Sequence, residues 1–397
     1  MSPSRKRKMR VAIQKKIKNL NIIISVLILA GCYSCNENNK DITTEGTFLY
    51  TEEIRHAEGF SIDYYKEFTK VTINNPWSND ERPYAEYYIY KSGETKNRVL
   101  EKGKYAISAP LSSLIVNTFS YFEFLNLLDE LEKVTGVTDG FRIYNPTILG
   151  KIERGTIKDL GDPFNPNIEK TIELNPGAVI NSAYAQSDSY SERIKTTGVP
   201  VIYSLEWMEN TPLARAEWIK MIAAFFGKGD LANSTFDDIE SRYFTIMKKV
   251  EGIESPKSLL AGDNFQGTWY LPGGKSFNAE LFRDAGLNYL YEDNNQSGSI
   301  GLDIESVLTH FGDTDIWFGC EVNSYNQLIN KDSKYRLLGP VKNKNVFNYH
   351  NRTTVLGGND YFESAIANPD LMLSDVVKAA YPNLLPNYSY SYIKPLN

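Results

Sequence analysis

The chain has 397 residues and a formal net charge of −6 at pH 7. The only charged residues among the first 31 are eight Lys or Arg, so the rest of the chain carries a net charge of −14, which disfavours nucleic acid as a partner. Three cysteines are too few for a fold held together by a disulfide framework.

The N-terminus has the order of segments that is typical of an export signal. Positions 1–18 contain all eight basic residues, and an apolar run, Leu20–Ala30, follows. This run is too short to span a bilayer as a stable helix, although an uncleaved anchor or a buried N-terminal helix remains the alternative. Its end, Leu29-Ala30-Gly31-Cys32, resembles the lipobox of bacterial lipoproteins, in which the thiol of the cysteine takes the lipid.

The lipobox resemblance implies a signal peptide over residues 1–31 and lipidation of Cys32. The mature protein would then face the periplasm from a membrane anchor in the cell envelope. The sequence leaves open whether Met1 or Met9 is the start and which membrane, inner or outer, holds the anchor. The polar residues that follow predict a flexible tether over 32–57, ahead of a folded part long enough for two domains.

Residues 58–108 alternate between apolar and polar side chains, which is typical of β-strands. The alternating runs are Phe68–Asn74, Ala85–Tyr90 and Tyr105–Ser108, with turn residues at Ser92-Gly93 and Lys102-Gly103. We therefore predict an antiparallel β ribbon at the start of a first lobe that spans residues 58–210.

From about residue 111, short apolar runs alternate with helical periodicity, which predicts parallel strands joined by crossover helices. The runs are Leu114–Val116, Val134–Val137, Phe141–Tyr144, Ala178–Ile180 and Val199–Tyr203. Residues 121–131 form one such helix, because their apolar residues fall on one face. Those residues are Phe122, Leu125, Leu128 and Leu131. Each run ends in polar or aromatic residues, where an open sheet of this kind binds its ligand.

Residues 211–252 predict a long helical connection between two lobes. Pro212 fits the first turn of a helix after Thr211, and Ser234-Thr235 fits the start of a second helix. The α/β pattern then begins again, with a strand at Ser258–Ala261, a helix near 277–285 and a strand at Ile316. The predicted fold class is α/β: two Rossmann-like lobes joined by the helical segment, the second over 253–397.

The two halves repeat a local arrangement. Asn167-Ile168-Glu169 opens a helical stretch in the first half, and Asp303-Ile304-Glu305 opens one in the second. The Asx side chain can cap free backbone N–H groups, and a Glu two positions later lies at the positive end of the helix dipole. Taken alone, this repeat indicates only two well-capped helix starts.

Six segments follow one another over most of residues 111–320. They are Leu114–Tyr121, Val134–Val137, Pro166–Glu169, Leu174–Ile180, Gly286-Leu287 and Leu302–Leu308. In this order they resemble the helical-backbone class of ABC-transporter substrate-binding proteins, which bind iron-siderophore complexes, haem or cobalamin.

The resemblance implies two lobes that capture an iron complex or cobalamin between them and deliver it to an ABC permease dimer with its ATPase. In that class one Glu on the rim of each lobe meets Arg residues of the permease, and by position these are Glu169 and Glu305. We expect a monomer and no enzymatic activity, while the identity of the iron complex or corrinoid stays open. The alternatives are a membrane-anchored carbohydrate-active enzyme and a surface-binding lipoprotein.

Aromatic residues make up 13% of the chain, and several fall where the lobes are expected to face each other. Trp and Tyr suit a flat or macrocyclic ligand, although each can serve instead in rim or core packing. The candidates for ligand contact are Thr118, Ser120, Tyr121, Tyr144, Asn145, Tyr184, Glu206 and Trp207 in the first lobe, and Trp269, Tyr270, Arg352 and Tyr361 in the second. Trp207, Trp269 and Tyr270 lead this set, and Arg352 fits either an anionic ligand or an ordinary ion pair.

The sequence offers little for a resident metal or for catalysis. The only three histidines, His56, His310 and His350, are far apart and have no metal-ligand spacing. We predict no catalytic residues, no metal site and no cofactor. Cys320, at the end of an apolar run, is expected to be a small buried residue rather than a reactive thiol.

Overall fold

The computed structural model describes residues 44–397 apart from 79–81, 94–96, 102 and 187. Residues Glu45–Asn397 form one compact unit. Cys32 and the predicted signal peptide lie outside the described residues. Within these ranges we find no helix of the length and apolar character needed to cross a bilayer.

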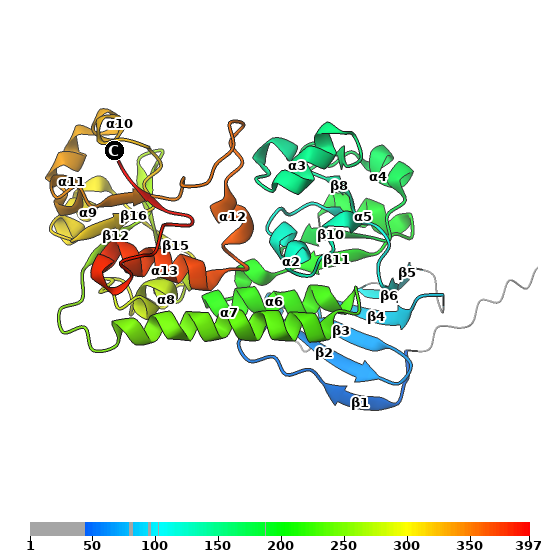
Figure 1. Ribbon diagram of the computed structural model, residues 1–397. Helices are drawn as coiled ribbons and strands as arrows, with labels where there is room; N and C mark the ends of the chain where they lie inside the picture. Colours follow the sequence, from blue (N-terminus) through cyan, green and yellow to red (C-terminus); the bar gives the residue numbers. More distant parts are fainter. Residues whose placement is uncertain (1–43, 79–81, 94–96, 102, 187) are drawn as a thin grey trace, which may run out of the picture. The chain divides into compact units, whose positions relative to one another are not determined.

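A six-stranded sheet precedes the lobes (Figure 1). In spatial order its strands are β1 (Phe48–Thr51), β2 (Phe60–Tyr65), β3 (Thr69–Ile73), β4 (Ala85–Lys91), β6 (Lys104–Ala109) and β5 (Arg98–Glu101). Neighbouring strands are antiparallel except β4 and β6, which run parallel. The predicted antiparallel ribbon is present, and one pair departs from it because β5 folds back at the outer edge and leaves β6 beside β4.

The tether predicted over 32–57 extends too far, because β1 already begins at Phe48. All side chains of β1 are exposed, so this strand shows no alternation of buried and exposed residues that the sequence could reveal. Tyr50 of β1 stacks on Tyr64 of β2 with ring centroids 4.5 Å apart, and this cross-strand pair stabilises the edge.

The first lobe is built on a five-stranded parallel sheet in the order β11-β10-β7-β8-β9. Its strands are β7 (Leu114–Val116), β8 (Val134–Val137), β9 (Lys158–Asp159), β10 (Ala178–Ser182) and β11 (Val201–Ser204). The helices between them are α2 (Tyr121–Leu127), α3 (Pro146–Glu153), α4 (Ile168–Leu174) and α5 (Ser189–Thr196). The run Phe141–Tyr144 is not a strand, because a 3₁₀ turn, Gly140–Arg142, occupies it. Strand order reverses at β7, and the carboxyl ends of strands at such a point commonly bind ligands.

Two helices connect the lobes, α6 (Pro212–Ala224) and α7 (Gly229–Val250). Pro212 is the first residue of α6, as predicted, and the hydroxyl of Thr211 caps the helix by accepting a hydrogen bond from the N–H of Ala214 at 3.1 Å. Gly227 adopts φ +65° and lets the chain leave α6. The second helix begins earlier than predicted, at Gly229; Ser234 lies inside it and its hydroxyl donates to a backbone carbonyl of the preceding turn.

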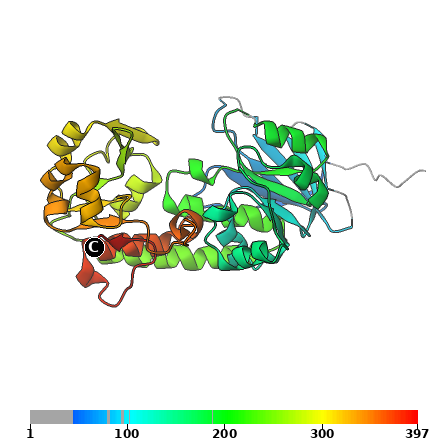
Figure 2. The ribbon, with the colours of Figure 1, turned by 90° about the horizontal axis from the view of Figure 1, so that it is seen from above.

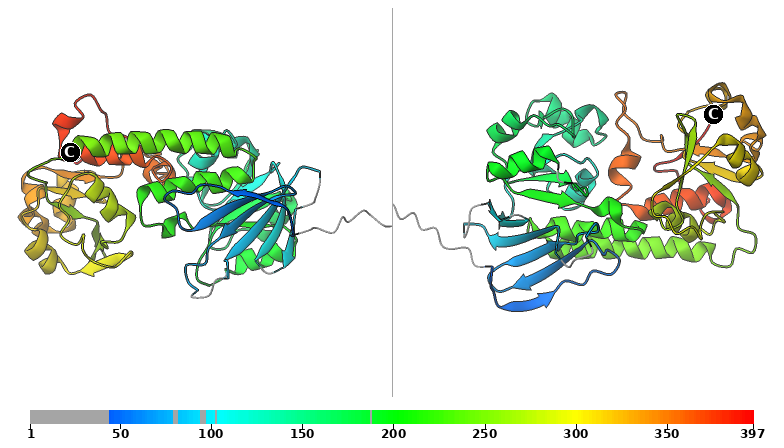
Figure 3. Two further views of the ribbon diagram at one scale, coloured as in Figure 1. Left: turned by 90° about the horizontal axis from the view of Figure 1, so that it is seen from below. Right: turned by 180° about the vertical axis from the view of Figure 1, so that it is seen from behind.

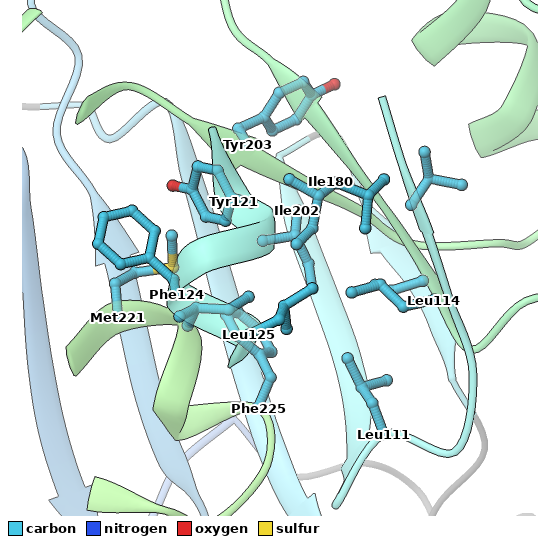
Figure 4. Close-up of a cluster of buried hydrophobic side chains, with 14 of the residues drawn as sticks. Leu111, Leu114, Tyr121, Phe124, Leu125, Ile180, Ile202, Tyr203, Met221 and Phe225 are labelled. Atoms are coloured by element: carbon cyan, nitrogen blue, oxygen red, sulfur yellow. The ribbon is translucent and has the colours of Figure 1, made fainter. Parts of the chain in front are cut away.

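The core of the first lobe lies between its sheet and α6. Figure 4 shows Tyr121, Phe124 and Leu125 of α2 packed near Met221 of α6 and Phe225 at its end. These side chains are all fully buried, so α6 is fixed to the first lobe by apolar packing.

The N-terminal sheet shares this core. The hydroxyl of Tyr87 on β4 donates to the carbonyl of Val201 at 3.0 Å and accepts from the N–H of Tyr203 at 2.9 Å. Because Tyr87 is fully buried, these two bonds join the sheet to β11 in an environment without competing water.

The second lobe contains two smaller sheets. The four-stranded sheet consists of β12 (Leu259–Ala261), β16 (Ile316–Phe318) and β17 (Val346–Asn348), which are parallel, and the antiparallel β18 (Lys394–Pro395). The antiparallel three-stranded sheet consists of β13 (Asp263–Phe265), β14 (Thr268–Pro272) and β15 (Ser299–Leu302). The helices of this lobe include α8 (Phe277–Asp284), α9 (Ile304–Phe311), α10 (Tyr325–Lys331) and α11 (Gly339–Lys342). The strands and the helix predicted for this lobe are confirmed.

The C-terminal part of the chain packs against the connecting helices and the first lobe. It does so through α12 (Asp360–Ser364) and α13 (Pro369–Ala380). Helix α13 lies alongside α7 (Figures 2 and 3), where Arg242 and Asp370 form an ion pair at 2.6 Å. Ala367, between the two helices, is buried in the core of the first lobe. Glu363 of α12 accepts a hydrogen bond from the N–H of Tyr144 at 2.7 Å. A segment from the range predicted for the second lobe therefore packs on the first.

Candidate functional site

A cavity of about 340 Å³ lies at the carboxyl ends of β7, β8 and β10, where the strand order reverses. Its lining includes Asn117, Thr118, Thr138, Asn181, Ser182 and Tyr184. We call it the first-lobe cavity. Two of the residues predicted to contact a ligand, Thr118 and Tyr184, are thus brought together here.

A larger cavity, of about 940 Å³, lies between the second lobe and the 3₁₀ turn Glu206–Met208 with the start of α6. Its lining includes Trp207, Arg215, Gly262, Tyr270, Tyr349 and Tyr361. Its volume is within the range of roughly 300–1,000 Å³ that is usual for small-molecule sites. Trp207, Tyr270 and Tyr361 were predicted from the sequence, whereas Arg215 and Tyr349 were not.

The two cavities meet at an aromatic pair. The ring of Trp207, in the large cavity, lies 5.9 Å from the ring of Tyr184, in the first-lobe cavity. Both rings keep exposed area, since Trp207 is 37% and Tyr184 44% exposed. A ligand that spans both cavities would therefore lie against these two rings.

Glu206 lies beneath this surface and is only 3% exposed. Its carboxyl group accepts hydrogen bonds from the hydroxyls of Ser204 and Ser120, the latter at 3.1 Å, and Ser120 bonds to Thr118 at 3.1 Å. Burial raises the pKa of Glu206. Glu206 is therefore a buried support beneath Trp207, a role different from the ligand contact predicted for it. Ser120 is half-buried, and ligand contact by it stays a prediction.

Two of the predicted contact residues are enclosed in the core. Tyr121 and Trp269 are fully buried, and the indole of Trp269 packs on Trp317 with centroids 5.0 Å apart and donates to the carbonyl of Ala261 at 2.9 Å. Side chains alternate along a strand, so the next residue of β14, Tyr270, faces the large cavity instead. The prediction of ligand contact is therefore wrong for Tyr121 and Trp269.

Arg352, Asn145 and Tyr144 have local structural partners. The Nε of Arg352 lies 2.9 Å from a carboxylate oxygen of Asp360, which is the ordinary ion pair that the sequence left open. Asn145 caps α3 by accepting backbone N–H groups, and Tyr144 uses its own N–H to bind Glu363. These contacts hold α12 and α3 in place. None of the three residues lines the first-lobe cavity or the large cavity, and ligand contact by them stays a prediction.

Two cations line the large cavity: Lys331, which pairs with Asp263 at 2.8 Å, and Arg215. Its guanidinium donates to the carbonyls of Trp207 at 2.6 Å and Glu209 at 3.3 Å, and lies 3.4 Å from the ring centroid of Phe277. In the described part of the chain no carboxylate lies within ion-pairing distance of it. Burial lowers the pKa of Arg215 to about 10, so it remains charged at neutral pH. A half-buried guanidinium without a counter-ion attracts an anionic ligand group.

The sequence held one signal for Arg215. It stands among the first four residues of α6, where the helix dipole disfavours a cation. Such a position indicates that the residue serves something other than helix stability.

Tyr349 and Tyr361 form a second aromatic surface of the large cavity. Their rings stack at 4.1 Å with an angle of 6° between planes. Burial raises the pKa of Tyr361 to about 12, although the charge of Arg215 opposes the shift, and burial also raises the pKa of Tyr349. Both phenols are therefore neutral hydrogen-bonding groups at neutral pH.

Glu169 and Glu305 occupy equivalent places in the two lobes. Each is the second residue of its helix, α4 or α9, and is exposed. The predicted caps are confirmed: Asn167 accepts from the N–H of Lys170 at 2.8 Å, and Asp303 accepts from the N–H of Ser306 at 2.7 Å. Glu305 also pairs with Lys334 at 2.7 Å, and this hydrogen bond lowers the pKa of Glu305.

Among the described residues, no three His, Cys, Asp or Glu side chains gather in a way that could hold a metal ion. Cys320 is 1% exposed, as the sequence predicted, and burial raises the pKa of its thiol to about 12. This thiol therefore remains protonated and poorly reactive at neutral pH.

The sequence model of the periplasmic binding protein family matches residues 114–353. An uncharacterized lipoprotein of Methanocaldococcus jannaschii is 25% identical over 399 aligned residues, which cover 93% of each chain. A periplasmic haem-binding protein of Vibrio cholerae has a TM-score of 0.54 and 15% identity, over 68% of this chain and all (100%) of that one. The periplasmic vitamin B12-binding protein of the same organism has a TM-score of 0.50 and 15% identity, over 68% of this chain and 97% of that one. At this identity the two structures show a shared fold.

Proposed function

Because the chain belongs to the periplasmic binding protein family, we propose that it captures a chelated metal or a corrinoid for an ABC importer. The relatives named for binding haem and vitamin B12 support a ligand of this chemical class. The family role is binding rather than catalysis, so the carbohydrate-active enzyme considered from the sequence is not retained.

The observation that carries this proposal is the pairing of Arg215 with aromatic rings in one large cavity. The guanidinium donates to backbone carbonyls, and no carboxylate of the described residues lies within ion-pairing distance of it. Tyr349 and Tyr361 offer flat surfaces and neutral hydroxyls in the same cavity, and Tyr270 adds a third ring. A flat or macrocyclic ligand with a carboxylate, or a chelate of net negative charge, would satisfy both features.

The proposal includes delivery of the ligand to a permease dimer through Glu169 and Glu305. Their exposure and their equivalent positions on α4 and α9 support this role. An exposed ion pair contributes only about 0.2–1 kcal/mol, so the two glutamates would mainly set the register and the rate of association. The lipoprotein name of the Methanocaldococcus relative supports a lipid anchor at Cys32.

The test is a ligand titration of the purified protein. Haemin, cyanocobalamin and the ferric hydroxamate ferrioxamine B are each titrated by calorimetry and by thermal unfolding. We expect at least one of them to bind and to raise the unfolding temperature, because a ligand at 100 times its Kd stabilises the folded state by about 2.7 kcal/mol.

For a ligand with an anionic group, Arg215→Ala should weaken binding about tenfold or more, because a charge-assisted hydrogen bond is lost. The matched control is Arg283→Ala, which removes an exposed arginine of α8 that pairs with Glu280. Failure of the wild-type protein to bind any of the three compounds would refute the proposed ligand class.

A further inference from the structure

Trp77 lies in the turn between β3 and β4, outside residues 114–353 that match the family. Its backbone N–H donates a hydrogen bond to the side-chain oxygen of Asn75 at 3.1 Å, which fixes the turn. Its ring lies 6.3 Å from the ring of Trp207, with 41° between the planes, and 5.6 Å from the ring of Tyr84. The N-terminal sheet therefore reaches the aromatic pair at which the two cavities meet.

The second ring of that pair is also held by the N-terminal sheet. The hydroxyl of Tyr84 donates to the carbonyl of Tyr184 at 3.2 Å, and its ring packs edge-on against Tyr203 at 5.0 Å. The backbone carbonyl of Trp207 accepts a hydrogen bond from the guanidinium of Arg215. Its indole has two aromatic neighbours, Tyr184 from the first lobe and Trp77 from the N-terminal sheet.

We propose that the N-terminal sheet takes part in ligand recognition through Trp77, which orients Trp207 and so adapts the junction of the two cavities to a flat unsaturated ring. The inference rests on the proposed function, because it concerns the same site. An indole that is already held in one rotamer loses less conformational entropy when a ligand stacks on it. Trp77 is thus a positioning residue that acts through Trp207.

The pairing of the two indoles has its own spectroscopic signature, exciton coupling in far-ultraviolet circular dichroism. Of the five tryptophans, Trp218, Trp269 and Trp317 are fully buried elsewhere. Difference spectra, wild type minus Trp77→Phe and wild type minus Trp207→Phe, should therefore both show the couplet of this one pair. Two difference spectra without a shared couplet would overturn the orientation of Trp207 by Trp77.

The effect on recognition is measured by titration with haemin, cyanocobalamin and ferrioxamine B. For a compound that the wild-type protein binds through a flat ring, Trp77→Ala should weaken binding roughly two- to tenfold, the equivalent of one aromatic pair. Trp77→Phe retains a ring at this position and should restore most of the affinity. Tyr50→Ala removes an aromatic pair at the far edge of the same sheet, and its affinity should equal that of the wild type.

The outcomes separate the two proposals. If the wild-type protein binds none of the three compounds, the proposed function fails, and the role of Trp77 in recognition fails with it. If the wild-type protein binds and Trp77→Ala binds equally well, only the role of Trp77 is overturned. Equal weakening by Trp77→Ala and Tyr50→Ala would also overturn it, because the effect would then be a general loosening of the sheet.

Discussion

Glu363 allows a test of how the C-terminal return, the segment that contains α12 and α13, is held against the first lobe. Its side chain is only 2% exposed, and it accepts the N–H of Tyr144 at 2.7 Å. Burial raises the pKa of Glu363 from 4.5 to about 8; the hydrogen bond from Tyr144 opposes this rise, and the negative charge of Asp360 adds to it.

The direction of the pH effect follows from the raised pKa. A carboxyl group whose pKa is higher in the folded protein binds its proton more tightly there than in the unfolded chain. Its contribution to stability is therefore complete below its pKa in the unfolded chain. That contribution is lost as the pH rises to its pKa in the folded protein. At neutral pH the loss is on the order of 3 kcal/mol, because a tenfold difference in proton affinity between the folded and unfolded states corresponds to about 1.36 kcal/mol. Glu363→Gln removes the charge and keeps an oxygen that can accept the N–H of Tyr144.

Urea unfolding near pH 5 and near pH 8 measures this effect. Near pH 8 we expect Glu363→Gln to be more stable than the wild type by about 4 kcal/mol, with a difference below about 1 kcal/mol near pH 5. Glu169→Gln, an exposed carboxylate of the same lobe, serves as the control and should leave the pH dependence unchanged. A parallel loss of stability in Glu363→Gln and the wild type between the two pH values would refute the buried-carboxyl effect.

Two further predictions concern buried and exposed carboxylates. Glu217, on α6, is fully buried and accepts hydrogen bonds from the N–H groups of residues 55–57 and from the ammonium of Lys220. Glu217→Ala should therefore lower the free energy of unfolding by about 3–5 kcal/mol. A loss below about 1 kcal/mol in urea unfolding would contradict this role. In a reconstituted transporter, the double variant Glu169→Ala with Glu305→Ala should cripple uptake while ligand affinity, measured by calorimetry, stays unchanged. Uptake equal to that of the wild type would end the docking assignment.

Four of the five strands of the first-lobe sheet could be predicted because both faces of that sheet are covered, so that these strands contain buried apolar residues, such as Leu114–Val116. The edge strand β9, Lys158–Asp159, has no apolar residue and could not be predicted. The starts of β1 and α7 could not be predicted, because neither has a distinctive sequence pattern. All of the side chains of β1 are exposed, and α7 begins at Gly229 without a side-chain cap, so neither start leaves a pattern in the sequence.

Part of the candidate site could be predicted because its residues follow strands of the first-lobe sheet. Trp207 and Tyr184 follow β11 and β10 and lie at the cavities for that reason. The sequence could not separate Trp269 from Tyr270, because adjacent residues of a strand face opposite sides and only the packing of β14 decides which side is the core. The position of Arg215 depends on Phe277, a residue of the other lobe, and no local pattern could reveal that contact.

The C-terminal return makes the two lobes interdependent during biosynthesis. A polypeptide that ended after α7 would lack Ala367, which fills the core of the first lobe, and the acceptor that Glu363 offers to the turn before α3. The first lobe therefore reaches its final packing only after the ribosome has made nearly the whole chain. Separate expression of the halves, or a split reporter cut in the loop after α7, would divide one hydrophobic interior between two polypeptides.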